Sequence, residues 1–354
     1  MEHSKILQLA LTGLLIASLP LSVVWAAKGG DKYRKLIVVT LFLTFDLIIF
    51  GAFTRLSDSG LGCPDWPGCY GHANPLQAHE QIQAAQAVMP DGPVTVSKAW
   101  IEMIHRFFAM AIGVLIIAIV IASWRLWRQQ KKAEHAPPLA FSLLFFVCVQ
   151  GAFGAWTVTL KLQPLIVTIH LLLGMLLLAM IAWLAARQSP QLQVKTSTRL
   201  VWLARAAIAV AFVQIGLGGW VSTNYATLAC LDYPLCQGSV LPEMDWQHGF
   251  TLWRELGKTA AGDYLPFAAL TAIHWLHRNM ALLVLVVIGA LAWQVRFIQP
   301  KLSRYLVLIL GWQVLTGVAT IFLKWPLAIA LAHNAGAAAL VLVLSMLNYL
   351  VRPR

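Results

Sequence analysis

Charged residues are scarce in this chain. Of its 354 residues, Lys and Arg number 26 and Asp and Glu number 14, together 11% of the sequence, against about 25% in ordinary soluble domains. Hydrophobic residues make up 59%, and the mean hydropathy is +0.73. So few charges cannot cover the surface of a soluble domain. The composition therefore predicts an integral membrane protein and excludes a disordered chain or a coiled coil.

Cysteine is rare too, and its five residues exclude a disulfide-dense secreted scaffold. Four of the five form two pairs, Cys63 with Cys69 and Cys230 with Cys236, each enclosing five residues of a loop that contains proline. A disulfide acting as a structural clamp accounts for both pairs, and a redox-active role stays open for the first. A zinc site is disfavoured because two cysteines alone leave it incomplete.

Nine runs of about 20 mostly apolar residues are long enough to cross a membrane as helices. They are too long and too continuous for barrel strands, so the predicted fold is an all-α, polytopic membrane protein. The first run ends in Ala26-Ala27, which resembles a signal-peptide cleavage site. We favour a retained helix, because cleavage would leave the basic residues after it outside. The runs cover residues 6–27, 36–54, 100–124, 139–160, 164–186, 200–221, 267–294, 304–323 and 327–350.

The net charge of +12 is a topology signal. One set of loops carries 16 basic and 2 acidic residues, whereas the segments on the opposite side carry 7 basic and 10 acidic residues. The side rich in Lys and Arg is expected to be cytoplasmic. This puts the N-terminus outside, the C-terminus inside, and the long loops 55–99 and 222–266 both outside. No nucleic-acid partner is needed to explain the charge.

Two stretches of the chain repeat one another. The run from Cys63 to Cys69 matches the run from Cys230 to Cys236 at an offset of 167 residues, and later matches keep nearly the same offset. Such agreement predicts two tandem parallel four-helix-bundle repeats, at 36–190 and 191–354, behind an extra N-terminal helix in 1–35. The matching positions are Gly51 and Gly218, Asp65 and Asp232, Pro67 and Pro234, Gly71 and Gly238, His105 and His277, Arg106 and Arg278, Gln150 and Gln313, Gly154 and Gly317, Thr157 and Thr320, Lys161 and Lys324, and His170 and His333.

The histidines fall into two groups. Ionisable side chains inside a membrane are costly and usually functional. His105 and His170 lie at similar depths below the outer ends of two parallel spans, and His277 and His333 repeat that arrangement. The histidines in loops or at the terminus are predicted to be solvated surface residues. These are His3, His72, His79, His135 and His248.

Two facing imidazoles in a helical bundle can be the axial ligands of a haem iron. Zinc would need a third or fourth ligand, and histidines that bond across helices are the structural alternative. Because two matched pairs occur, we favour haem at both, and no Cys-x-x-Cys-His is present for covalent attachment. His274, three residues before His277, is the competing ligand in the second half.

The two halves differ beside these histidines. Glu102 lies three residues before His105 on the same helix face, and its counterpart in the second half is His274. A carboxylate inside a membrane favours a role in proton handling, with a structural acceptor as the alternative. Arg106 and Arg278 directly follow the matched histidines, where they can pair with haem propionates or extend toward the outer interface.

Together these features resemble the haem A synthase family. The resemblance rests on duplicated four-helix halves, two Cys pairs, Glu-x-x-His-Arg in the first half and four histidines within spans. Residues 51–71 (GAFTRLSDSGLGCPDWPGCYG) and 150–161 (QGAFGAWTVTLK) are similar to those of proteobacterial members. The resemblance covers about 36–350, and the first helix departs from the family's usual eight spans.

The resemblance implies an oxidoreductase of the bacterial inner membrane. Its members oxidise the C8 methyl group of haem O to a formyl group, which gives haem A for cytochrome oxidase. It further implies that His277 and His333 hold a haem b, that His105 and His170 bind the substrate haem, and that Glu102 is the catalytic carboxylate. Haem O synthase and an unidentified electron partner are implied as partners, with membrane lipid around the chain and a homo-oligomer left open.

Two other classes of protein stay open as alternatives. A membrane cytochrome b with two bis-His haems, acting only in electron transfer, would need no carboxylate beside one pair. A transporter built on parallel repeats would need a polar site near the midplane, whereas these histidines cluster near the outer side. The sequence ranks the enzyme first, the cytochrome second and the transporter third.

Overall fold

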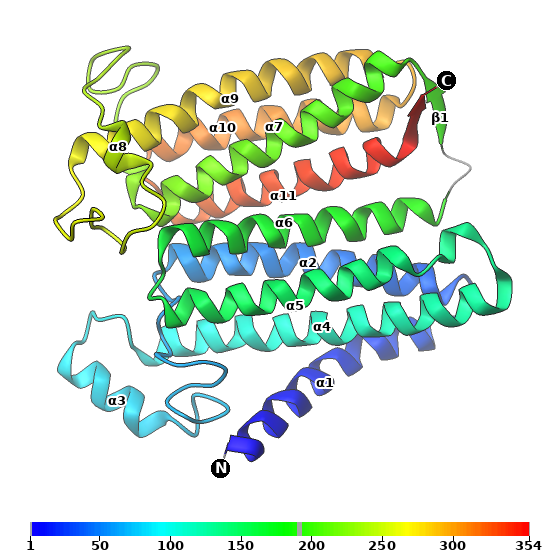
Figure 1. Cartoon of the computed structure of the whole chain (residues 1–354), viewed down its shortest axis with the longest axis horizontal. Helices are drawn as coiled ribbons and strands as arrows, with labels where there is room; N and C mark the ends of the chain where they lie inside the picture. The colour runs from blue at the N-terminus through cyan, green and yellow to red at the C-terminus, as the bar shows by residue number, and fades with distance from the viewer. Residues whose placement is uncertain (1, 190–192, 354) are drawn as a thin grey trace. The chain divides into compact units, whose positions relative to one another are not determined.

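The computed structural model describes residues 2–189 and 193–353, with side chains from Ser4 onward. Within this part, nine helices are long and apolar enough to cross a membrane, one at each predicted run (Figure 1). The prediction of an all-α, multi-pass membrane protein is therefore confirmed. The nine are α1 (Glu2–Ala26), α2 (Lys32–Leu56), α4 (Val96–Gln130), α5 (Pro138–Thr159), α6 (Pro164–Arg187), α7 (Thr198–Thr223), α9 (Phe267–Val295), α10 (Pro300–Phe322) and α11 (Leu327–Leu350).

Local sequence signals set several helix ends. Asp31, Thr95 and Ser197 each accept a hydrogen bond from a backbone amide two or three residues on, which caps the first turns of α2, α4 and α7. Helices α5, α6 and α10 begin with a proline, whose fixed φ and missing N–H suit the first turn. Helix α4 stops at Lys131, where a φ of 54° turns the chain into the left-handed region.

Several short elements were not predicted. Helix α3 (His79–Val88) lies between α2 and α4, and α8 (Trp246–Gly249) lies between α7 and α9. Strand β1 (Val194–Thr196) pairs in parallel with β2 (Val351–Pro353), so Val194 faces Val351 across the ladder. A hydropathy window detects long apolar runs only, and none of these elements is one. The predicted boundary between the halves, at residues 190 and 191, lies outside the described residues.

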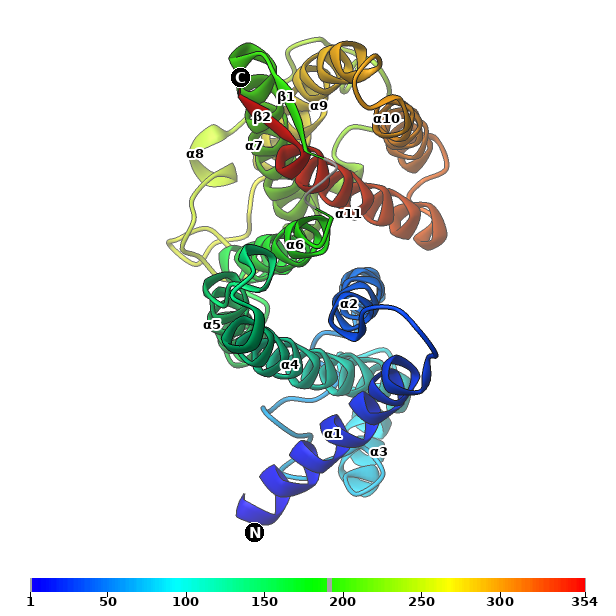
Figure 2. The same cartoon turned by 90° about the vertical axis from the view of Figure 1, so that its right-hand side faces the viewer.

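The helices pack into two units, Met1–Leu162 with Met180–Gln188, and Gln163–Ala179 with Ser189–Arg354. In the first unit, α1, α2 and α5 each pack against α4, and α1 also contacts α2. In the second unit, α7 packs on α9, α9 on α10, α10 on α11 and α11 on α7, so each helix has two neighbours (Figure 2).

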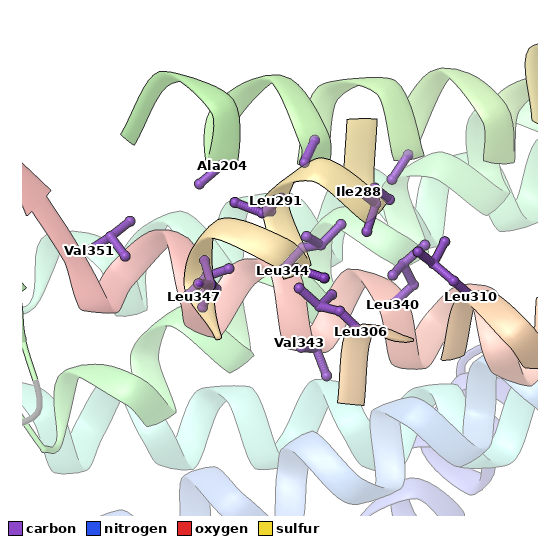
Figure 3. Packing of buried hydrophobic residues seen from close by; sticks show 14 of the residues in the cluster. Ala204, Ile288, Leu291, Leu306, Leu310, Leu340, Val343, Leu344, Leu347 and Val351 are labelled. Atoms are coloured by element: carbon purple, nitrogen blue, oxygen red, sulfur yellow. The ribbon is translucent and has the colours of Figure 1, made fainter. Parts of the chain in front are cut away.

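A continuous apolar core fills the second unit. It draws on all four of its long helices and on β2, and the side chains of different helices interleave (Figure 3). Leu291 of α9, Leu306 of α10 and Leu344 of α11 are fully buried, with 0% of each exposed. Leu308, two residues after Leu306 and so on the opposite side of α10, is 62% exposed. The helices are thus apolar all round, and burial rather than hydropathy separates core from surface.

Removing a core side chain should therefore destabilise the second unit. We expect Leu344→Ala to lower the free energy of unfolding by about 2–4 kcal/mol, because it deletes packed atoms and leaves a cavity. Leu308→Ala, the control, should have a small effect. The measurement is the midpoint of thermal unfolding in detergent, and equal shifts for the two variants would contradict the assignment of the core.

Candidate haem-binding site

The first cysteine pair closes a compact loop. Cys63 and Cys69 are joined by a disulfide, as predicted, and both are fully buried. The side chain of Asp65, inside the loop, accepts hydrogen bonds from the backbone amides of Tyr70 at 2.6 Å and Gly71 at 2.8 Å. Tyr70 and Gly71 both have positive φ, at 50° and 78°, which makes this sharp turn possible.

The second cysteine pair closes a loop of the same local form. Cys230 and Cys236 are joined by a disulfide, again as predicted. Asp232 accepts hydrogen bonds from the amides of Gln237 and Gly238, each at 2.8 Å. The amide of Gly238, and then that of Gln237, stabilise the ionised carboxylate and lower the pKa of Asp232 from its ordinary value.

Glu102 on α4 ties the first loop to the membrane-spanning helices. Its side chain is 5% exposed, its Oε2 accepts from the Cys63 amide at 2.8 Å, and its Oε1 accepts from Arg106 at 2.5 Å. Arg106 also donates to the carbonyl oxygens of Asp65 at 3.0 Å and Gly68 at 2.6 Å. Together, the Glu102 carboxylate and the Arg106 guanidinium provide hydrogen-bond partners for one backbone amide and two carbonyl oxygens of the loop.

In the second half, His274 stands where Glu102 stands in the first. Its Nδ1 accepts a hydrogen bond from the Cys230 amide at 3.2 Å, and its side chain is buried. Arg278 donates to the carbonyl oxygens of Pro234 at 3.2 Å and Leu235 at 2.9 Å. Each loop therefore meets a buried acceptor and an arginine, but the ion pair between Arg106 and Glu102 depends on the carboxylate of the first half.

The role of the two arginines in holding these loops was missed from the sequence. The two expectations were pairing with propionates and extension toward the interface, and neither included the loop carbonyls. One signal was present, because Arg106 follows Glu102 by four residues on the same helix face. The carbonyls could not be foreseen, because they depend on how the loop folds back over α4.

Three of the four matched histidines lie against a glycine of a neighbouring helix. A Cβ placed on Gly51 would lie 3.0 Å from the His105 ring, one on Gly218 3.0 Å from His277, and one on Gly317 3.3 Å from His333. These distances are too short for a larger side chain without displacement of the ring. The Phe50 ring also stacks on His105, at 6.2 Å between centroids. The glycines let α2 approach α4, α7 approach α9, and α10 approach α11 at the imidazoles.

His277 on α9 and His333 on α11 both belong to the second unit. Nδ1 of His277 lies 3.2 Å from the side-chain nitrogen of Gln214, and Nδ1 of His333 lies 2.9 Å from the hydroxyl of Thr316. Gln313 also donates to the His333 carbonyl oxygen at 3.0 Å. Both rings thus sit on a glycine with a polar group at Nδ1.

The pairing of His105 with His170 stays a prediction. His105 is part of the first unit, and His170 lies in the segment of α6 that packs with the second. Within residues 2–189 and 193–353, no three His, Cys, Asp or Glu side chains gather as a site for a metal ion. A haem needs only one or two side-chain ligands because its porphyrin supplies the others, so single buried imidazoles fit it.

The prediction for the loop histidines is wrong at His135. This residue is 7% exposed, because the short turn Ala133–His135 folds onto α4, where Ser123 donates to its carbonyl oxygen at 2.9 Å. Its ring meets Tyr33 edge-on at 5.5 Å. His79 is exposed as predicted, while His72 and His248 are half-buried. The side chain of His3 lies outside the described residues.

Comparison with known proteins decides the family. The family model described as "Cytochrome oxidase assembly protein" matches residues 34–345. The haem A synthase of Shewanella oneidensis is 39% identical over 321 residues, which cover 89% of this chain and 95% of that protein. The chain belongs to the haem A synthase family. The haem A synthases of Erythrobacter litoralis (28% identical, 85% of this chain and 91% of that protein) and Sphingopyxis alaskensis (29%, 92% and 93%) also match.

Helix α1 lies outside the part of the chain that matches the haem A synthase family. The family match begins at residue 34, inside α2, so α1 precedes it. Helix α1 packs on α4, where a Cβ on Gly13 would meet Met110 at 3.0 Å. The helix that bears Glu102 and His105 is therefore braced on one side by an element outside the matched region.

The docking of the first loop can be tested at Gly62. A Cβ there would lie 2.4–2.5 Å from backbone atoms of Lys98 and Ala99, which cannot move aside. We expect Gly62→Ala to lift the loop from α4, stretch the bond between Cys63 and Glu102, and speed reduction of the disulfide severalfold. Thiol labelling under a soluble phosphine measures the rate.

The control is Gly60→Ala in the same loop. A Cβ at Gly60 meets only the flexible end of Leu162, at 3.2 Å, and should be tolerated. Equal reduction rates for the two variants would show that Gly62 does not hold the loop against α4.

Proposed function

We propose that this chain is an oxidoreductase that converts haem O to haem A by oxidising the C8 methyl group to a formyl group. The observation that carries the proposal is 39% identity, over 89% of the chain, to a haem A synthase. The family match over residues 34–345 supports it, because the match includes every histidine and carboxylate assigned a role below.

We infer that the chain from α2 onward is a tandem duplication of a four-helix unit. The support is a set of paired details. Each half has a disulfide loop folded around an aspartate, a buried acceptor for the first cysteine's amide, an arginine on loop carbonyls, and a glycine against a histidine. Such agreement in detail is expected of a duplicated unit and not of two unrelated bundles.

The second half is proposed to hold a resident haem b through His277 and His333. Both rings sit on glycines, and both belong to one packed unit. We prefer His277 to His274 because His274 already accepts from the Cys230 amide, in the place of Glu102. Arg278 donates to the loop through Nη2, whereas its Nη1 is buried without a hydrogen-bond partner among the described residues. We propose that Nη1 donates to a haem propionate. When bound, a haem b would supply one-electron chemistry to the oxidation.

The first half is proposed to hold the substrate, haem O, through His105 and His170. His105 has the same glycine contact as its counterpart, and Phe50 adds an aromatic surface beside the ring. Arg106 follows His105 directly and links this site to the cysteine loop in two ways. It donates to the Gly68 carbonyl oxygen, and it donates to Glu102, which accepts from the Cys63 amide. A farnesylated substrate suits entry sideways from the surrounding membrane lipid.

Glu102 is proposed to take up protons released in the oxidation. Converting a methyl group to a formyl group removes electrons and protons, and a buried site needs an acceptor for the protons. Glu102 lies on the same helix face as His105. Both of its oxygens accept hydrogen bonds, as an ionised carboxylate requires. Its counterpart, His274, leaves the second half without a carboxylate at this position.

The cellular setting follows from the same reasoning. We propose a bacterial inner-membrane protein with the N-terminus outside and the C-terminus cytoplasmic, because basic residues concentrate in one set of loops. Haem O synthase would supply the substrate. An electron partner must accept the electrons removed from the methyl group. A homo-oligomer is compatible with the proposal.

The reaction is tested by co-expressing the full chain with a haem O synthase under aerobic conditions and analysing extracted haems by mass. We expect haem A or hydroxylated haem O. Glu102→Ala should abolish both products while haem b is retained, because the variant loses the proton acceptor and not the resident haem. Haem b with no modified haem from the unaltered chain would favour the alternative, a bis-His cytochrome b. Normal haem A output from Glu102→Ala would remove the catalytic role.

The resident haem is tested at its ligands. His333→Ala should lose haem b, seen as loss of the low-spin absorption spectrum in the purified protein, because one axial bond is gone. His274→Ala should keep that spectrum, and the exposed His79→Ala serves as control. Loss of haem b from His274→Ala, with retention in a His277→Ala variant, would move the ligand to His274.

A further inference from the structure

Thr316 is the polar neighbour of the His333 ring. Its hydroxyl lies 2.9 Å from His333 Nδ1 and donates to the Trp312 carbonyl oxygen at 2.7 Å. A hydroxyl has one proton, so with that proton directed at Trp312 its oxygen can only accept from the ring. His333 therefore carries its own proton on Nδ1.

The position of that proton decides which ring atom can bind a metal. A neutral imidazole has one N–H and one lone pair, so a proton on Nδ1 leaves the lone pair on Nε2. Histidines that bind metals usually donate their other N–H to a protein oxygen, which fixes the ring and makes the ligand more basic. Thr316 provides such an oxygen to His333.

Gln214 is the polar neighbour of the His277 ring. Its side-chain nitrogen lies 3.2 Å from Nδ1 and 3.1 Å from the His277 carbonyl oxygen. Its Oε1 is buried and has no hydrogen-bond partner among the residues the structure describes. The amide nitrogen can only donate, so its bond to the carbonyl oxygen ties Gln214 to the main chain of His277. Gln214 therefore fixes where His277 lies beside α7.

Neither neighbour has a polar counterpart in the first half. Counted by the repeat offsets, Leu47 stands in place of Gln214 and Phe153 in place of Thr316. Leucine and phenylalanine side chains cannot form hydrogen bonds to a ring nitrogen. The glycines beside the rings repeat, whereas these two positions differ between the halves.

We propose that Thr316 and Gln214 are positioning residues: Thr316 holds the His333 ring with its proton on Nδ1, Gln214 holds His277 through its carbonyl oxygen, and both contacts help the second half to retain its haem. This inference rests on the proposed function, in which these histidines are the ligands of haem b. A resident haem must stay through many turnovers, whereas the substrate haem must leave as product. Rings oriented before binding lose less freedom on binding, which favours retention.

The test measures the haem b of the purified full chain. Thr316→Val keeps the side chain's shape without the hydroxyl, and Gln214→Leu introduces the first-half residue. A less basic ligand stabilises ferric iron less. In Thr316→Val the ratio of ferric to ferrous affinity should therefore fall about tenfold, a rise in midpoint potential of about 59 mV for a one-electron couple. Both variants should also lose haem b faster to a haem-scavenging protein.

Two further variants separate positioning from general damage. Thr320→Val removes a hydroxyl on the same helix that bonds only the Gly317 carbonyl oxygen, at 2.6 Å, and should keep the original potential. Thr316→Ser restores the oxygen and should restore the potential.

If Thr316→Val and Gln214→Leu keep the original potential and rate of haem loss, while His333→Ala loses haem b, the positioning role is wrong and the ligand assignment stands. If His333→Ala retains haem b, the ligand assignment and this inference are both wrong.

Discussion

A glycine facing an imidazole is the contact on which the arrangement of the site depends. At Gly51, Gly218 and Gly317 the absence of a side chain lets one helix approach the next until its backbone lies against a histidine ring. A ring held in this way has little freedom to turn. In a membrane, where lipid tails are as apolar as leucine, such close packing replaces the hydrophobic effect as the force that joins helices. The same contact therefore joins the helices and orients the imidazoles.

The second constraint is the buried acceptor beneath each cysteine loop. A backbone amide at Cys63 or Cys230 needs a partner when the loop covers the helices, and a side chain three residues before the matched histidine supplies it. Either a carboxylate or an imidazole meets that structural need. The residue at this position can therefore differ between the halves according to the chemistry that each half needs. At this position only the first half carries a carboxylate, so one scaffold can support two different tasks.

Much of this could be predicted from the sequence, because long apolar runs and repeated residues report directly on spans and on duplicated positions. The nine spans and both disulfides are confirmed by the structure. The loop elements α3 and α8, the strand pair and the burial of His135 were missed, since each depends on contacts between segments far apart in the chain. The hydrogen bonds of Arg106 to Asp65 and Gly68 were missed for the same reason. Hydropathy measures how a residue prefers lipid to water and carries no information on which carbonyl a side chain will meet.

The parallel pairing of β1 with β2 has a consequence for how the protein is made. Val194 lies just before α7, and its partner Val351 lies just after α11, so the ladder joins the two ends of the last four long helices. A nascent chain emerges from the ribosome in order, and earlier segments generally fold first. The ladder can form only after α7, α9, α10 and α11 have all been synthesised, because β2 follows the last of them. The second unit therefore closes at this end only when its four long helices are complete, and disrupting β2 would leave it open there.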